Sequence, residues 1–169
     1  AVRTLSMPCR ERRCAAVADG ASPARWAPSL YGRPGVEKCL LHLQAGGADV
    51  CLLLSALWLE QRNVTCTEPR CAALQALARP WQHEVVKPLR QLRINWREAA
   101  LQDQQLAGLR EQIKSLEIQA ERSLLLQLEQ HCKTWPQEAP DDWLGKLAAM
   151  AGRDNRDALE ALRTAAAEA

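Results

Sequence analysis

Four basic side chains recur at helical spacing between Pro80 and Ala100. At about 100° per residue, the three arginines cluster within about 60° and the lysine lies at their margin. Guanidinium groups one turn apart could bind successive phosphates or an acidic partner. A charged stripe more often has an ordinary structural role, and we favour that interpretation: the side chains pair with Glu111, Glu117 or Glu121 of the next helix, or they are simply solvated. We call these residues the basic face: Lys87, Arg90, Arg93 and Arg97.

Seven cysteines raise the question of metal or redox chemistry. The candidate pairs are Cys9 with Cys14 and Cys66 with Cys71, each separated by four residues. No C-x-x-C occurs, and the three histidines do not fall at zinc-finger spacing, so we expect no metal and no cofactor. The odd number and irregular spacing also speak against a disulfide framework. The cysteines expected to act as small core residues are Cys39, Cys51 and Cys71.

Signatures of catalysis are missing from the sequence. It contains no phosphate-binding glycine loop, nucleophile elbow, paired-histidine zinc helix or calcium loop. A polar cluster could form where Tyr31 and Arg33, in a turn, meet Asp49 at the start of a helix. We interpret this cluster as one that locks the turn, with a ligand site as the alternative.

The composition favours helices. The chain has 169 residues, of which 47% are apolar, with no phenylalanine and one tyrosine. Leucine and alanine must therefore fill the core, and both suit helices better than strands. The formal charge of +2 is no evidence for nucleic-acid binding.

Breakers and caps mark the first helices. Pro34 and Gly35 precede a helix that Gly46 and Gly47 end, and Asp49 should cap a second helix that runs to about Gln61. That second helix is apolar on every side, which predicts the central helix of a bundle.

The next helix should be capped by Thr67 and separated by Pro80 from the helix that carries the basic face. We expect a kink or a restart of that helix at Pro88. Its core stripe should be Val85, Leu89, Leu92 and Trp96.

The longest element should run from Asp103, as N-cap, to Cys132, over about 45 Å. Seven apolar residues at a mean step near 3.67 predict its core stripe: Leu106, Leu109, Ile113, Leu116, Ala120, Leu124 and Leu128. A second apolar row lies on a different face of this helix, at Ile118, Leu125 and Cys132, and another segment must pack on it. We favour the C-terminal segment folding back over this row, with a homo-oligomer as the alternative.

The two ends differ in character. Residues 1–22 are expected to be disordered, with Met7 as an alternative start, and they lack the apolar core of a secretory signal. Residues 134–169 form an acidic helical segment of net charge −3, against +3 for residues 63–102, and we expect it to pack on a helical domain of residues 23–133. No stretch approaches the roughly 20 apolar residues of a membrane span, so a cytoplasmic protein is expected.

Two separated blocks carry a resemblance. The first is Leu30–Val36 (Leu-Tyr-Gly-Arg-Pro-Gly-Val), followed by Gly47–Val50 (Gly-Ala-Asp-Val) and Leu52–Leu54. The second is Glu84–Arg90 (Glu-Val-Val-Lys-Pro-Leu-Arg), followed by Leu109–Lys114. Over about residues 25–133 the chain resembles a family of small bacterial proteins of unknown function. The resemblance supports the helical fold and implies no activity, substrate or cofactor.

These patterns together predict an all-α bundle of five to seven helices that includes one long helix. The favoured function is a non-enzymatic interaction or adaptor protein with an unidentified protein partner. The first alternative is a regulator or assembly factor that binds RNA or DNA through the basic face. The second is a thiol-redox protein or an enzyme.

Overall fold

The structure, a computed structural model, describes residues 22–24, 27, 30, 32–149 and 156–167. Within these ranges the chain forms helices and no strand, and its longest helix has 29 residues. The predicted all-α fold with one long helix is therefore confirmed. The chain divides into two compact units. Residues 1–66 and 134–169 form the first, which we call the discontinuous unit, and residues 67–133 form the second, which we call the hairpin unit.

The discontinuous unit contains helices from both ends of the chain. The helices of this unit whose bounds are described include α3 (Val36–Ala45), α4 (Val50–Gln61), α8 (Trp143–Ala149) and α9 (Arg156–Ala167). Helix α8 packs against α4, and α9 packs against α3. Helix α4 is buried at nine of its twelve residues. The burial of this helix, predicted from its uniform apolar character, is confirmed within the discontinuous unit.

Local sequence signals account for the start of α4. The chain reverses after α3 at Gly47, whose φ of 95° suits glycine because it has no Cβ. Asp49 then accepts hydrogen bonds from the backbone N–H groups of Cys51 and Leu52, at 2.9 and 3.2 Å. These bonds satisfy two of the amides that have no partner within the first helical turn.

The C-terminal segment is fastened to α4 by polar contacts. Trp143 is fully buried, and its indole N–H donates to the Val64 carbonyl at 2.6 Å. Glu60 of α4 accepts a hydrogen bond from the Leu144 N–H at 2.8 Å and forms an ion pair with Arg163 of α9 at 3.2 Å. The hydrogen bond to Glu60 raises the pKa of Arg163, which therefore stays charged.

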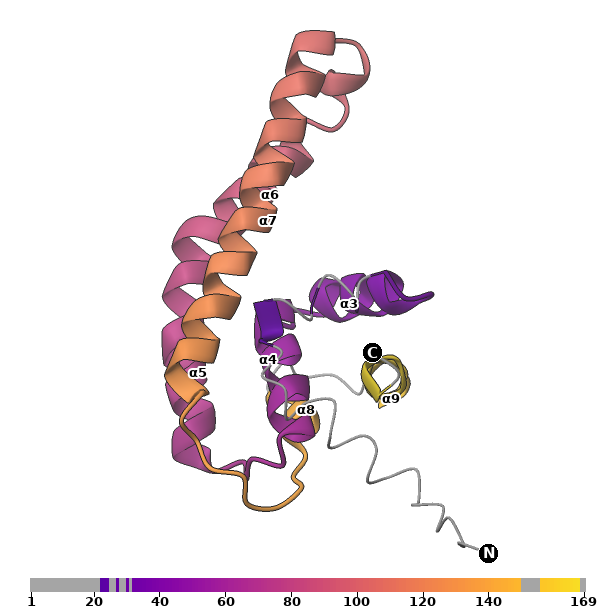
Figure 1. The fold of residues 1–169 in the computed structure, drawn as a ribbon. Coiled ribbons are helices and arrows are strands. Elements are labelled where there is room, and N and C mark those ends of the chain that lie inside the picture. Colours follow the sequence, from indigo (N-terminus) through magenta and orange to yellow (C-terminus); the bar gives the residue numbers. More distant parts are fainter. Residues whose placement is uncertain (1–21, 25–26, 28–29, 31, 150–155, 168–169) are drawn as a thin grey trace, which may run out of the picture. The chain divides into compact units, whose positions relative to one another are not determined.

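The hairpin unit is formed by two antiparallel helical arms (Figure 1). Helix α5 (Glu68–Trp81), π-helix η1 (Gln82–Val86) and helix α6 (Lys87–Asn95) follow one another without a break and form the first arm. A turn with the short 3-10 helix η2 (Ala99–Leu101) leads into α7 (Gln104–Cys132), the second arm. Thr67 caps α5 and Asp103 caps α7, as predicted.

The predicted break at Pro80 is wrong, because Pro80 lies inside α5. The helix instead widens at η1, where the Lys87 N–H donates to the Gln82 carbonyl five residues earlier. A π turn inserts one residue relative to an α-helix and shifts the buried face accordingly. Val86 is therefore fully buried, whereas the predicted core residue Val85 is only half-buried.

The two halves of α7 are buried to different degrees. Ala120, Leu124 and Leu128 are buried, as the predicted core stripe requires. Leu109 and Leu116 of the same stripe are 48% and 47% exposed, which corrects that prediction for the first half of the helix. The hairpin has only two layers there, so side chains at the edge of the stripe are left without a cover.

Candidate functional site

An ion-pair cluster joins the two arms of the hairpin. Arg90 Nε and Arg93 Nε lie 2.8 and 2.6 Å from the two carboxylate oxygens of Glu117, and Arg90 Nη2 lies 2.9 Å from Glu121 Oε1. Arg110 Nε donates to the Arg93 carbonyl at 2.9 Å. Glu117 itself is only 6% exposed. The sequence left pairing with the next helix and simple solvation open, and pairing is observed for Arg90 and Arg93.

The charges of this cluster are mutually stabilising. Burial alone would raise the pKa of Glu117, but hydrogen bonds from Arg93 and Arg90 outweigh it and hold that pKa below its ordinary value. The hydrogen bond to Glu117 in turn raises the pKa of Arg93. A buried carboxylate between two guanidinium groups is an arrangement that fixes how two helices align.

The basic face is therefore divided between two environments. Arg90 and Arg93 are half-buried in the cluster, whereas Lys87 and Arg97 are exposed. Anion binding by these four residues stays a prediction, and the two exposed side chains are the ones most accessible to a ligand.

The other predicted site residues are those of the polar turn cluster and the cysteines. Tyr31 lies outside the described residues, Arg33 is half-buried, and the Asp49 carboxylate caps α4. The polar turn cluster thus stays a prediction. Cys51, Cys66 and Cys132 are buried, and Cys39 and Cys71 are half-buried, whereas Cys9 and Cys14 lie outside the described residues. Within the described ranges no three histidine, cysteine, aspartate or glutamate side chains gather as metal ligands would.

Helix α7 carries an uncharged row of side chains along its length. Stepping by four and three residues from Gln105 to Gln130, this row contains no charged residue. Seven of its eight members are exposed and Ser123 is half-buried, and the three leucines are 47–49% exposed. We call this row the uncharged face: Gln105, Leu109, Gln112, Leu116, Gln119, Ser123, Leu126 and Gln130.

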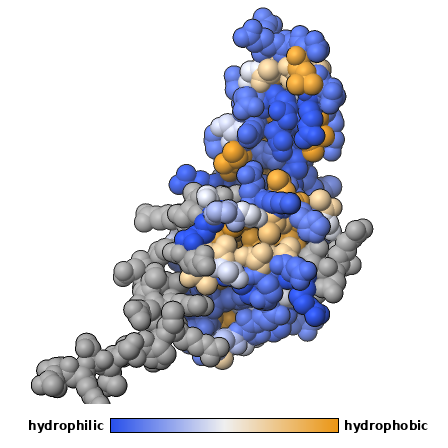
Figure 2. Space-filling view, turned by 90° about the vertical axis from the view of Figure 1, so that its right-hand side faces the viewer, coloured by the Kyte–Doolittle hydropathy of each residue, from blue (hydrophilic) through white to orange (hydrophobic). Residues whose placement is uncertain are grey.

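Polar members of the uncharged face bond within their own helix. Gln119 Nε2 donates to Ser115 Oγ at 3.3 Å, and Ser123 Oγ donates to the Gln119 carbonyl at 3.0 Å. These bonds leave the leucine side chains accessible. Figure 2 shows separate hydrophobic patches on the otherwise hydrophilic end of the hairpin unit, at the top of the view.

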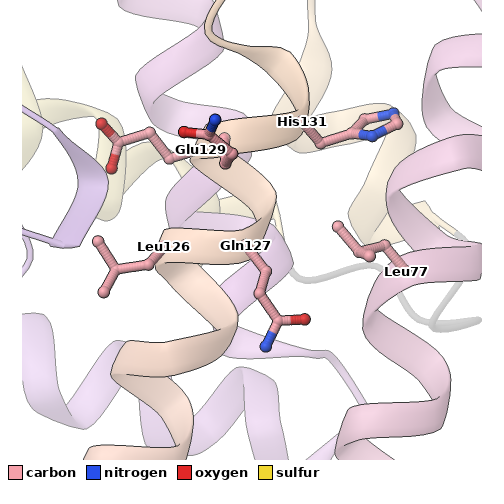
Figure 3. Close-up of a pocket in the computed structure, with 6 residues that line it drawn as sticks. Leu77, Leu126, Gln127, Glu129 and His131 are labelled. Atoms are coloured by element: carbon pink, nitrogen blue, oxygen red, sulfur yellow. The ribbon is translucent and has the colours of Figure 1, made fainter.

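A pocket opens beside the C-terminal end of this face (Figure 3). It is lined by Leu77 of α5 and by Leu126, Gln127, Glu129, Gln130 and His131 of α7. In Figure 3 the Leu126 and Glu129 side chains project from one side of α7, whereas His131 projects from the other side, toward α5. Only Leu126 and Gln130 of this lining belong to the uncharged face, and the pocket is too open to enclose a small molecule.

Sequence reasoning missed the uncharged face. Its signal was present as the alternating steps of four and three residues, but glutamine and serine fill five of its eight positions. The predicted apolar stripe therefore combined two leucines of this face, Leu109 and Leu116, with the neighbouring row that includes Ile113, Ala120 and Leu124.

The fold and these surfaces define a class: an all-α protein with a helical hairpin inserted into a small helical unit. Residues 25–128 match the family described as "Protein of unknown function (DUF2390)". Because that match covers more than half of the chain, the protein belongs to this family. Comparisons with curated proteins and with solved structures give no match. Over the described residues, each helix is either too short or too polar to cross a lipid bilayer.

Proposed function

We propose that this protein is a non-enzymatic interaction protein of the bacterial cytoplasm, and that the uncharged face of α7 is its binding surface. The observation that carries the proposal is the exposure of Leu109, Leu116 and Leu126 at close to half their area on a row without charge. The centres of protein interfaces are depleted of charged residues in the same way. The odd number and irregular spacing of the seven cysteines support a reducing compartment.

The nucleic-acid alternative has less support. Two of its four basic side chains, Arg90 and Arg93, already bind the Glu117 carboxylate. A phosphate would have to compete with that carboxylate for the same guanidinium groups. Lys87 and Arg97 alone would supply at most two phosphate contacts, which is few for a nucleic-acid site.

The test is a pull-down of the tagged protein from its own cells, with and without nuclease. Wild type is compared with Leu109→Lys, which places a charge on the uncharged face. The matched control is Ile118→Lys on the same helix, because Ile118 is 56% exposed and lies outside that face. A third variant, Lys87→Glu with Arg97→Glu, removes the exposed basic groups and leaves the Glu117 cluster intact.

We expect a protein partner that survives nuclease, is lost with Leu109→Lys and is kept by the other two variants. A partner that is released by nuclease and lost with the Lys87 and Arg97 variant would overturn the proposal in favour of nucleic-acid binding.

A further inference from the structure

We propose that the first arm of the hairpin unit is a two-state switch. In the structure this arm contains the π turn at Gln82–Val86. In the second state it is an unbroken α-helix, with α6 turned about its own axis. The Glu117 carboxylate of α7 selects the first state. The inference goes beyond the proposed function, because it concerns how the basic face is presented and not what the uncharged face binds.

The π turn decides which side of α6 meets α7. It inserts one residue relative to an α-helix, and the Lys87 N–H donates to the Gln82 carbonyl across it. An unbroken α-helix over the same residues would turn α6 by about 100° and advance it by about 1.5 Å. Each place on α6 would then be held by the residue before its present occupant. Val85 would thus take the place of the fully buried Val86, so either state puts a valine in the core.

The apolar residues of α6 fit the second state better than the first. None of the nine residues of α6 is buried in the structure, and Leu89, Leu92 and Trp96 are half-buried. In the second state Leu89 would take the place of Arg90. Leu92 would likewise take the place of Arg93. The apolar stripe that helical spacing predicts for this arm would then face α7 along its whole length.

The charged contacts of α6 favour the first state. Arg90 Nε and Arg93 Nε lie 2.8 and 2.6 Å from the Glu117 carboxylate, which is almost fully buried. Arg110 also donates to the Arg93 carbonyl at 2.9 Å. In the second state leucines would stand where these arginines are, and a buried carboxylate without a partner is costly. Glu117 is therefore the group that holds the π turn in place.

The switch controls the exposure of the arginines. Arg90, Arg93 and Arg97 keep their mutual spacing on α6 in both states, within about 60°. In the second state all three turn together by about 100° from their present directions, and the first two leave the carboxylate. The register of the arm thus decides whether these guanidinium groups pair inside the hairpin or face the solvent. Single π turns are frequent at functional sites, and a helix that moves between two packed positions is an established kind of switch.

Replacing Glu117 by leucine in the full chain tests the inference. Leucine removes the selecting charge and offers an apolar partner to the leucines of α6, whereas glutamine would leave a buried amide in both states. Methyl NMR under reducing conditions identifies the state. In wild type we expect nuclear Overhauser effects between α7 and the Val86 methyl groups, and in Glu117→Leu we expect them between α7 and Val85. Glu111→Leu, at an exposed position of α7, should keep the wild-type pattern.

Deletion of His83 provides a second, independent test. His83 is exposed and lies within the π turn. Without it an unbroken α-helix keeps the present register of α6, with its arginines beside Glu117, and the second state is lost. Glu117→Leu should therefore lower the folding equilibrium constant by roughly tenfold more in the deletion background than in the full chain, because only the full chain can turn α6.

Three outcomes would overturn the switch. The first is a Glu117→Leu chain that keeps the contacts of Val86 with α7. The second is an equal cost of Glu117→Leu in the two backgrounds. The third is a Glu117→Leu chain that does not fold, because the second state is expected to accommodate the leucine. If the deletion variant alone does not fold, the NMR pattern of Glu117→Leu in the full chain decides.

Discussion

Glu117 is the residue on which the alignment of the two hairpin arms depends most. Its carboxylate is buried and receives hydrogen bonds from two arginines of the opposite arm. Removing one member of a buried ion pair leaves its partner charges buried and unpaired. The loss of folding stability is therefore larger than the stability that the pair itself contributes. The cost of a substitution here should therefore exceed that of any exposed carboxylate on α7.

Replacing Glu117 by glutamine tests this expectation. We predict that Glu117→Gln lowers the free energy of unfolding by roughly 3 kcal/mol, because two guanidinium groups lose their counter-ion. Urea unfolding followed by circular dichroism measures the change. Glu111→Gln, at an exposed position of the same helix, should change it by less than about 0.5 kcal/mol. Equal effects of the two substitutions would contradict the role of the cluster.

The same carboxylate predicts a dependence of stability on pH. The pKa of Glu117 is lower in the folded chain than its ordinary value of about 4.3. The contribution of ionised Glu117 to the free energy of unfolding is therefore fully present at pH values above that ordinary pKa. It is lost as the pH falls through the pKa of the folded chain. We expect the unfolding free energy of wild type to fall more steeply below pH ~4.3 than that of Glu117→Gln.

Asp141 serves as an internal reference in this measurement. The hydrogen bond from Lys146 lowers the pKa of Asp141. Protonation of Asp141 therefore lowers the free energy of unfolding at acidic pH in both wild type and Glu117→Gln. The difference between the two curves therefore isolates Glu117. Parallel curves would show that Glu117 is not held ionised by its arginines.

At the scale of elements, two glycines predict opposite effects of the same substitution. A Cβ at Gly145 would overlap the Asp142 carboxylate, which accepts a hydrogen bond from the Gly145 N–H at 2.8 Å and pairs with Arg163. Gly145→Ala should displace this cap of α8 and lower the free energy of unfolding by about 1 kcal/mol. Thermal unfolding at matched protein concentration measures the effect.

Gly108 is the matched control, because a Cβ there would have no atom within 4 Å. Gly108→Ala lies inside α7 and should stabilise the protein by about 0.5–1 kcal/mol through helix propensity. If Gly145→Ala stabilises the protein as well, Asp142 does not cap α8 in the way described.

The elements also show which features were predictable from sequence. Asp49, Thr67 and Asp103 were predicted as caps because a cap depends on residues within one turn of it. The division at Pro80 was wrong because proline forbids one backbone hydrogen bond but does not decide between a break and a wider turn. In the structure the helix continues through Pro80 and widens at residues 82–86 instead.

The candidate site was predictable to a similar degree. Helical spacing identified the row of arginines and proposed their partners, and Glu117 and Glu121 are indeed the carboxylates that bind Arg90. The spacing of residues identifies which side of a helix they share, but not how deeply each one is buried. The exposure of Leu109 and Leu116 was therefore not predicted. How far a stripe is buried depends on the number of layers around it, which is a property of the tertiary structure.

At the scale of the whole molecule, the helices α8 and α9 complete the discontinuous unit. Trp143, Leu144 and Leu162 are fully buried, and burying side chains of this size contributes about 1.5–3 kcal/mol each. We predict that a chain ending at Lys133 loses on the order of 5 kcal/mol of stability in this unit and exposes apolar surface of α4.

Binding of a hydrophobic dye and hydrogen exchange of the α4 amides measure this loss. Trp143→Ala, in the full-length chain, should cause a smaller change of the same sign, of roughly 3–5 kcal/mol or less. An α4 that is equally protected with and without residues 134–169 would contradict the packing of α8 against it.

The interrupted course of the discontinuous unit has a consequence for the newly made protein. The ribosome completes α4 and then synthesises the whole hairpin before the residues of α8 and α9 emerge. At roughly 5–20 residues per second this interval lasts several seconds. The hairpin, whose arms are neighbours along the chain, can fold in far less time. During the interval α4 exists without α8 and α9, so the newly made chain has a defined period in which chaperones can recognise it.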